Sequence, residues 1–178
     1  MKKILVMLLC CIITVGAYAS KPVSLGVRTG WAYSNLKFKE GGFTKSANGF
    51  NLGAFLRANV KKIYIEPAIN YAFMKGASED AAKVNYIQVP VMVGYNLVSI
   101  KDVKLRGFVG PEFDFLAKET KKVLNGDLNT VSWYGKVGVG IDVWKITCDL
   151  DYKFALSKTG DGVEKGKGVN LTIGFKIF

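Results

Sequence analysis

Apolar and polar residues alternate with a period of two in eight segments of this chain, and long and short connections join these segments in turn. Such alternation is typical of β-strands with one apolar face. Most segments exceed the ~9–11 residues that cross a bilayer at a tilt. The predicted strands are Val23–Phe38, Gly49–Val60, Ile63–Met74, Val84–Val98, Val103–Ala117, Val131–Trp144, Ile146–Ser157 and Gly168–Phe178.

The connections differ in length according to the side of the sheet on which they lie. The long, polar ones are Lys39–Asn48, Lys75–Lys83, Lys118–Thr130 and Lys158–Lys167. The short ones are Lys61-Lys62, Ser99–Asp102 and Trp144-Lys145. Outer-membrane barrels have short periplasmic turns and longer external loops. We therefore predict an all-β fold, an eight-stranded antiparallel up-and-down transmembrane β-barrel with both termini on the short-turn side.

The first residues resemble a secretory signal. Lys2 and Lys3 precede the apolar run Ile4–Val15, and Ala17-Tyr18-Ala19 offers small residues for cleavage before Ser20. A membrane helix is the alternative, but this run is shorter than the ~20 residues that a spanning helix needs. We predict a signal peptide over residues 1–19 and one barrel domain over 20–178.

The phase of the alternation indicates which face points outward. In the segment 131–144, one face holds Val137, Val139, Ile141 and Val143, and the other holds Lys136, Gly138, Gly140 and Asp142. A soluble ligand-binding barrel needs its large apolar groups inside, whereas the second face here is small, glycine-rich or charged. The apolar face is therefore predicted to contact lipid. A soluble periplasmic barrel, the alternative, requires the opposite orientation.

The predicted interior is rich in charge. Its members are Arg28, Arg57, Glu66, Lys104, Arg106, Glu112, Asp114, Lys136, Asp142, Asp149, Asp151, Lys153 and Lys176. Eight strands leave room only for side chains, so buried charges must pair or meet water. The turn at Lys61-Lys62 sets Arg57 opposite Glu66, and the turn near Trp144 is predicted to set Asp142 opposite Asp149, with Lys176 as their cation. Two interpretations stay open, a structural plug and a narrow gated ion path.

Aromatic residues are predicted to gather at two heights, as in the girdles at the two interfaces of outer-membrane barrels. Near the long loops lie Trp31, Tyr33, Phe50, Tyr71, Phe73, Phe113, Phe115, Trp133 and Phe154. Near the short turns lie Tyr95, Trp144 and Phe175. Ordinary strand preference for aromatic residues does not predict such clustering.

The residue inventory excludes several chemistries. The chain has no histidine, so Ser/His/Asp and Cys/His pairs and His-based metal sites are absent. Only Cys148 follows the predicted signal, which leaves no disulfide and no thiolate metal cluster. Asp149 and Asp151 share a face, but inward positions beside lysines explain them more simply than acid/base catalysis. We predict no catalytic residue, no metal and no cofactor.

The excess of basic over acidic residues indicates what the protein can bind. Of the 25 basic residues, two lie in the predicted signal, so 23 remain against 14 acidic residues, a net charge of +9. An exported protein rarely meets nucleic acid, so we predict contact with outer-membrane lipid head groups and lipopolysaccharide, and none with nucleic acid. The charges are spread over loops and turns, which favours a solvated rim over a specific polyanion site.

Three segments resemble the PorT-type outer-membrane β-barrel domain family. They are Ile65-Glu66-Pro67-Ala68-Ile69-Asn70-Tyr71 with Lys75-Gly76-Ala77, Asn85-Tyr86-Ile87-Gln88-Val89-Pro90-Val91, and Gly107-Phe108-Val109-Gly110-Pro111. The similarity continues through Gly138-Val139-Gly140 and Asp149-Leu150-Asp151-Tyr152 to Phe178. In the first segment Glu precedes Pro, which departs from the family pattern.

The resemblance implies a barrel in the cell outer membrane of a Gram-negative organism, inserted by the general assembly machinery, and it carries over no catalytic residue. It also implies strand prolines, here Pro67, Pro90 and Pro111, which local bulges would accommodate. Terminal Phe178 shares phase with inward Lys176, although an assembly signal usually ends with an outward aromatic residue.

The sequence thus predicts a porin-like outer-membrane barrel with a structural or interaction role, whose external loops contact a protein partner or surface polysaccharide. The alternatives are a narrow channel, a component linked to secretion, as some members of the resembled family are, and a lipid-modifying enzyme, which the missing histidine disfavours.

Overall fold

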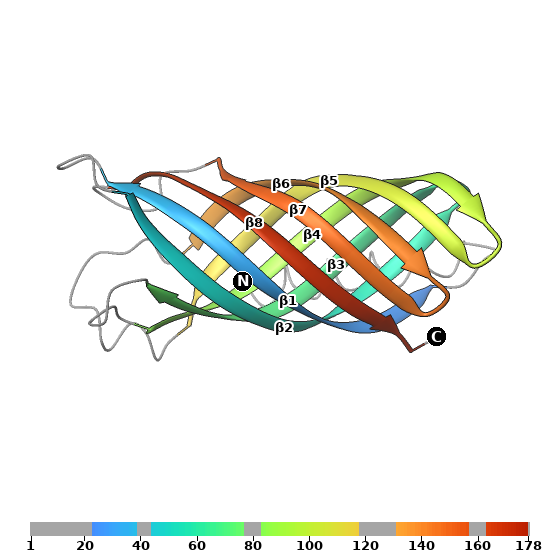
Figure 1. Cartoon of the computed structure of the whole chain (residues 1–178), viewed down its shortest axis with the longest axis horizontal. Helices are drawn as coiled ribbons and strands as arrows, with labels where there is room; N and C mark the ends of the chain where they lie inside the picture. The colour runs from blue at the N-terminus through green and yellow to red at the C-terminus, as the bar shows by residue number, and fades with distance from the viewer. Residues whose placement is uncertain (1–22, 39–43, 77–82, 118–130, 157–162, 178) are drawn as a thin grey trace, which may run out of the picture.

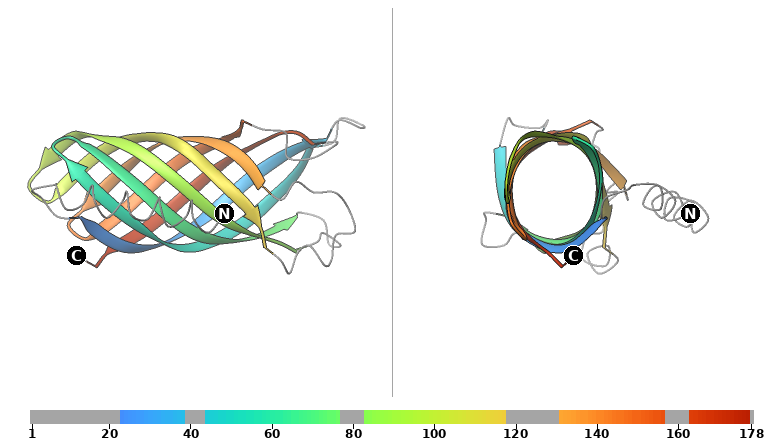
Figure 2. Two further views of the ribbon diagram at one scale, coloured as in Figure 1. Left: turned by 180° about the vertical axis from the view of Figure 1, so that it is seen from behind. Right: turned by 90° about the vertical axis from the view of Figure 1, so that its right-hand side faces the viewer.

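The computed structural model describes residues 23–38, 44–76, 83–117, 131–156 and 163–177. Over these residues the chain forms an antiparallel sheet that closes into a barrel where β1 pairs with β8 (Figure 1). Viewed along its axis, the sheet is a complete ring (Figure 2). The strands are β1 Ser24–Phe38, β2 Thr44–Val60, β3 Ile63–Gly76, β4 Lys83–Ile100, β5 Val103–Leu116, β6 Val131–Val143, β7 Ile146–Ala155 and β8 Val163–Lys176. The predicted fold class is confirmed.

Four strands, β2, β3, β4 and β8, extend beyond their predicted bounds, and the largest extensions are at the starts of β2 and β8. β2 and β8 each begin five residues before the predicted start. These extensions are polar or glycine-rich on both faces, so backbone pairing extends them: Leu36 of β1 pairs with Lys45 on one side and Gly166 on the other. The predicted signal peptide, Phe178 and most of the predicted long loops lie outside the described residues.

Each short connection is a two-residue turn whose first residue has a positive φ. The angles are 58° at Lys61, 48° at Lys101 and 54° at Trp144. Two-residue hairpins require such angles, and glycine or asparagine adopts them at least cost. The second turn contains only Lys101 and Asp102, because Ile100 already pairs with Val103. The predicted turn Ser99–Asp102 is therefore two residues too long.

The two faces of the wall differ in the predicted way. On β6 the apolar side chains of Val137, Val139 and Ile141 are 42–53% exposed, whereas Lys136 and Asp142 on the other face are buried. The same contrast runs around the barrel, so the outer surface is a broad apolar band. Monomeric soluble proteins rarely expose so large an apolar surface, whereas hydrocarbon solvates it. Among the described residues, no helix is long and apolar enough to cross a membrane.

The strand prolines are accommodated without bulges, so that expectation was wrong. Around Pro67 the β2–β3 register is unchanged, because Phe55 pairs with Ala68 and Ala58 with Ile65. The registers around Pro90 and Pro111 are also continuous. The register shifts among the described pairs lie elsewhere, at Lys37/Phe38 and at Asn96/Val98. A proline therefore interrupts hydrogen bonding here without inserting a residue.

Aromatic rings also line the lumen. The sequence predicted an inner face of small, glycine-rich or charged residues, which did not include these rings. Phe55, Tyr64 and Phe108 point inward and are buried. Each lies opposite a glycine on the neighbouring strand: Phe55 pairs with Gly26, Tyr64 with Gly94 and Phe108 with Gly138. A Cβ on any of these glycines would overlap the facing ring. The glycines thus make room for rings, which cover the exposed backbone in return.

Candidate functional site

Twelve charged side chains fill the lumen among the described residues, and ten ion pairs join them into two clusters. The turn-side cluster holds Arg28, Arg57, Glu66, Arg106, Asp142, Asp149 and Lys176. The loop-side cluster holds Glu112, Asp114, Lys136, Asp151 and Lys153. With six cations and six anions, the enclosed charge is balanced.

Arg106 is the centre of the turn-side cluster and is 1% exposed. Its Nε donates to Asp142 Oδ1 at 2.9 Å, and its Nη2 donates to Asp149 Oδ1. Its Nη1 donates to the hydroxyl of Tyr64 at 3.0 Å, and its guanidinium lies over the ring of Phe108. One side chain therefore neutralises two carboxylates and packs against the aromatic lining.

Asp142 and Asp149 do not face each other, so that prediction was wrong. The β6–β7 turn contains only Trp144 and Lys145, and Asp142 consequently pairs with Thr147 and Asp149 with Gly140. The two carboxylates meet through Arg106 instead. Lys176 lies on the adjacent β8 and donates to Asp142 Oδ2 at 3.0 Å.

Arg57 connects strands on opposite sides of the barrel. Its Nε donates to Glu66 Oε2 at 2.6 Å on the adjacent β3, and its Nη1 donates to Asp142 Oδ2 at 2.6 Å on β6. Glu66 also accepts from Arg28, at 3.2 Å. Because β2 and β6 are separated by three strands on either side, the Arg57–Asp142 pair crosses the lumen itself.

The loop-side cluster is built from two lysines and three acids. Lys153 Nζ lies 2.5 Å from Glu112 Oε1 and 2.6 Å from Asp114 Oδ2. Lys136 Nζ lies 3.1 Å from Glu112 Oε2 and 3.0 Å from Asp151 Oδ1. Lys153 also lies 3.9 Å from the ring centroid of Tyr134. Both ammonium groups thus exchange hydration for carboxylate oxygens inside the barrel.

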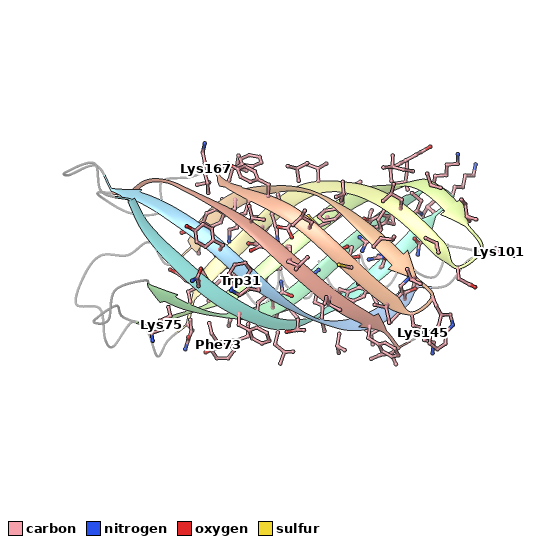
Figure 3. The ribbon with its side chains drawn as sticks, viewed as in Figure 1. Trp31, Phe73, Lys75, Lys101, Lys145 and Lys167 are labelled. Atoms are coloured by element: carbon pink, nitrogen blue, oxygen red, sulfur yellow. The ribbon has the colours of Figure 1, made fainter. Side chains whose placement is uncertain are left out.

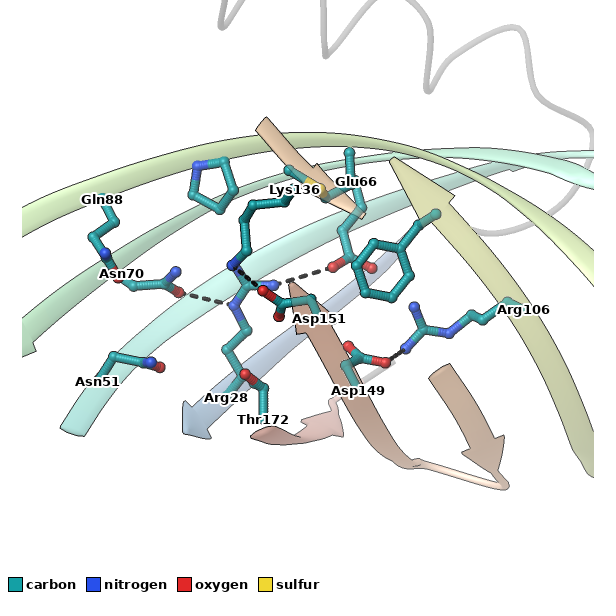
Figure 4. A pocket seen from close by; sticks show the side chains of 13 residues that line it. Arg28, Asn51, Glu66, Asn70, Gln88, Arg106, Lys136, Asp149, Asp151 and Thr172 are labelled. Atoms are coloured by element: carbon teal, nitrogen blue, oxygen red, sulfur yellow. Dashed lines mark hydrogen bonds and ion pairs between the residues drawn. The ribbon is translucent and has the colours of Figure 1, made fainter. Parts of the chain in front are cut away.

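Between the two clusters lies a small polar cavity of about 20 Å³ (Figure 4). Arg28 and Lys136 point into it from opposite clusters, and Arg28 Nε donates to Asn70 Oδ1 at 2.8 Å. A space of this size holds about one water molecule. The cavity between the two clusters is therefore too small to serve as a wide aqueous path.

Lys104 differs from the other predicted interior residues. Its backbone has the inward phase of Arg106, but it lies near the start of β5, where its side chain reaches the mouth of the barrel and is exposed. It belongs to neither cluster, because none of the ten ion pairs includes it. Alternation alone does not indicate where along a strand the enclosed part of the lumen ends.

The predicted interface aromatics lie on the outer surface in two groups. Near the long loops, Trp31, Tyr33, Phe50, Phe73, Phe115 and Trp133 are exposed, and Tyr71, Phe113 and Phe154 are half-buried. Ring pairs join Trp31 to Tyr33, Tyr71 to Phe73 and Phe113 to Trp133. Tyr95, Trp144 and Phe175 are exposed towards the short turns. The prediction omitted Tyr152, which is exposed and stacks with Phe154.

No catalytic or metal-binding constellation emerges from the part of the chain that the structure describes. The six acidic side chains of the interior clusters pair with arginine or lysine, and no group of three or more acidic or cysteine residues among the described ones could hold a metal ion. Cys148 is a free thiol on β7. The described interior is thus packed and charge-balanced.

An apolar outer band, aromatic belts and an ion-paired interior together define an integral outer-membrane β-barrel protein. Residues 18–160 match the family described as the outer membrane protein beta-barrel domain, and the chain belongs to that family. Membership places it in the outer membrane. The PorT type stays a prediction, as does cleavage near Ala19-Ser20.

Several solved structures share the fold. The attachment invasion locus protein Ail of Yersinia pestis has a TM-score of 0.56 and 17% identity over 87% of this chain and 99% of its own. A de novo designed transmembrane β-barrel has a TM-score of 0.53 and 16% identity over 89% and 99%. The outer membrane enzyme PagL has a TM-score of 0.50 and 9% identity over 83% and 99%. At these identities the likeness shows the fold alone. No curated protein matches the chain.

Proposed function

We propose that this protein is a closed, non-catalytic outer-membrane barrel whose role is structural or interactive, exercised at its two ends rather than through its lumen. The observation that carries the proposal is the Arg57–Asp142 pair, which crosses the lumen at 2.6 Å. The cavity between the two clusters measures about 20 Å³. A solute would have to break several buried ion pairs to pass, and each such break is costly.

The proposal extends to partners. We infer that lipopolysaccharide and a protein or polysaccharide contact the connections on the long-loop side, and that the general assembly machinery inserts the barrel. The basic surplus of the sequence supports contact with anionic surfaces. A component linked to secretion is the finer alternative and rests on the PorT resemblance.

A narrow channel is the second candidate, favoured by the polar cavity between the two clusters. Planar-bilayer recordings of the purified protein distinguish the two. A closed barrel gives no discrete conductance steps, whereas recurrent steps of uniform size would overturn the closed-lumen proposal. The neutralising variant Arg57→Met tests the assignment of the plug, because only a channel gated at this pair should change its conductance in that variant.

The non-catalytic part of the proposal is tested separately. The sequence holds no histidine to act as a general base, which supports the absence of hydrolysis. Incubation with phospholipids and lipopolysaccharide, followed by mass spectrometry of released acyl chains, should show no turnover. Release that scales with protein concentration would refute it.

The interactive part depends on the loops. Replacing residues 118–130, the longest connection, with a short Gly/Ser linker should leave the barrel folded and abolish cross-linking to its partner in intact cells. Unchanged cross-linking would move the contact away from that connection.

A further inference from the structure

The three short turns share one residue pattern that the functions above do not use. Each has exposed aliphatic or branched side chains on both flanks and a lysine in the turn: Val60-Lys61-Lys62-Ile63, Ile100-Lys101-Asp102-Val103 and Val143-Trp144-Lys145-Ile146. The six flanking side chains are 42–66% exposed. We call these twelve residues the short-turn rim. In each of the three turns a lysine is therefore directly next to an exposed aliphatic residue in the sequence, and the three turns lie at the same edge of the barrel.

Backbone hydrogen bonds tie each turn to a neighbouring element. Lys62 O accepts from Asn96 N at 2.7 Å, Asp102 O accepts from Trp144 N at 2.8 Å, and Lys145 O accepts from Lys176 N at 2.7 Å. These bonds carry the contact from one hairpin to the next. The lysines are consequently displayed from a fixed edge rather than from separate loops.

The charge at this edge has little internal compensation. Lys61, Lys62, Lys101 and Lys145 face the single acid Asp102 within the rim, a net charge of +3. The Nζ atom of Lys145 lies 5.5 Å from the Trp144 ring centroid and 6.0 Å from that of Phe175, at the upper end of cation–π range. In Figure 3, Lys101 and Lys145 project at this end of the barrel.

A complementary ligand must present negative charge at the level of the lysines and hydrocarbon directly beneath it. A soluble polyanion satisfies only the first requirement and would leave the six aliphatic side chains in water. A phospholipid satisfies both, because its phosphate and its acyl chains belong to one molecule. We propose that the short-turn rim binds anionic phospholipids, with head groups on Lys61, Lys62 and Lys101 and acyl chains along the flanking aliphatics.

Trp144 lies in the rim and can report on its own lipid neighbours. The variant Trp31→Phe/Trp133→Phe keeps only this tryptophan and is reconstituted in phosphatidylcholine with brominated chains, which quench its fluorescence. Unbrominated phosphatidylglycerol should displace the quencher about fivefold more effectively than unbrominated phosphatidylcholine, the ratio expected from one lysine near an anionic head group. High salt should reduce that ratio towards one.

In the same background, Lys61→Gln/Lys62→Gln/Lys101→Gln should remove the preference, while Lys145 is kept because it lies over the reporter ring. Lys75→Gln/Lys167→Gln, which neutralises exposed lysines of β3 and β8 at the other end (Figure 3), is the matched control and should retain it. Equal displacement by both lipids in the parent, a preference insensitive to salt, or loss of preference in the control variant alone would overturn the proposal. If the triple variant does not fold, the proposal is tested by the parent alone, through the ratio of displacement by phosphatidylglycerol to that by phosphatidylcholine and through the effect of salt on this ratio.

Discussion

Replacing Arg106 by methionine is the sharpest test of how the interior is held together. The guanidinium is 1% exposed and hydrogen-bonds to Asp142, Asp149 and Tyr64. Methionine has a similar length and fits among aromatic rings, but it carries no charge. The substitution therefore removes the ionic contacts while leaving most of the packing in place.

The expected loss of stability in Arg106→Met depends on the ion pairs that Asp142 and Asp149 retain in the variant. Asp142 retains Arg57 at 2.6 Å and Lys176 at 3.0 Å. Asp149, in contrast, forms its one ion pair among the described residues with Arg106. Removing one partner of a buried pair costs roughly 3–5 kcal/mol, because a charge is left uncompensated. We expect Arg106→Met to lower the free energy of unfolding by about that amount.

Urea unfolding of the barrel in lipid vesicles, followed by tryptophan fluorescence and gel mobility, measures the effect. Adding Asp149→Asn removes the stranded charge and should return the double variant to within about 2 kcal/mol of the parent. Lys104→Met is the control on the same strand and should change stability by less than about 0.5 kcal/mol. A loss below about 1 kcal/mol in Arg106→Met, or no recovery in the double variant, would refute the reasoning.

Three further substitutions test other parts of the structure by the same unfolding assay. Gly138→Ala would place a Cβ 2.6 Å from Leu150 O and should lower the free energy of unfolding by about 1–3 kcal/mol. Gly107→Ala is the control: the nearest atom to its Cβ would be 3.8 Å away, so this change should be neutral or stabilising. Lys61→Gly relieves a positive φ of 58° and should stabilise by up to about 1 kcal/mol; a loss would contradict the turn geometry. Val139→Arg on the outer face should cost about 2–4 kcal/mol in a bilayer, with Val139→Leu as control; tolerance of the charge would contradict a lipid-facing wall.

The strand order and the faces could be predicted because a period of two assigns every side chain to one of two sides. Register could be predicted from a two-residue turn when the pairing was counted outward from that turn. With Lys61-Lys62 as the turn, Arg57 and Glu66 were placed opposite each other, and they lie 2.6 Å apart. At the β6–β7 hairpin the turn Trp144-Lys145 was also placed correctly, but Asp142 was paired with Asp149 instead of Thr147, a register two residues away from the observed one.

Contacts across the lumen could not be predicted in this way. Arg57 and Asp142 are 85 residues apart, and their meeting depends on barrel diameter and strand tilt, which local alternation does not specify. The inward aromatic rings, in contrast, could have been predicted from the sequence. Once register is known, Tyr64 and Phe108 each face a glycine on the next strand, and such pairs indicate a ring lying over bare backbone.

The balance of the interior also determines where the basic surplus lies. Among the described residues, six interior charges are positive and six are negative, so these two clusters add nothing to the net charge of +9 of residues 20–178. That surplus therefore lies outside the two clusters. A barrel that neutralises its own lumen has no electrostatic need for a solute there, whereas its ends attract anions. This distribution of charge supports the proposed contacts with anionic lipid at the short-turn rim and with lipopolysaccharide on the long-loop side.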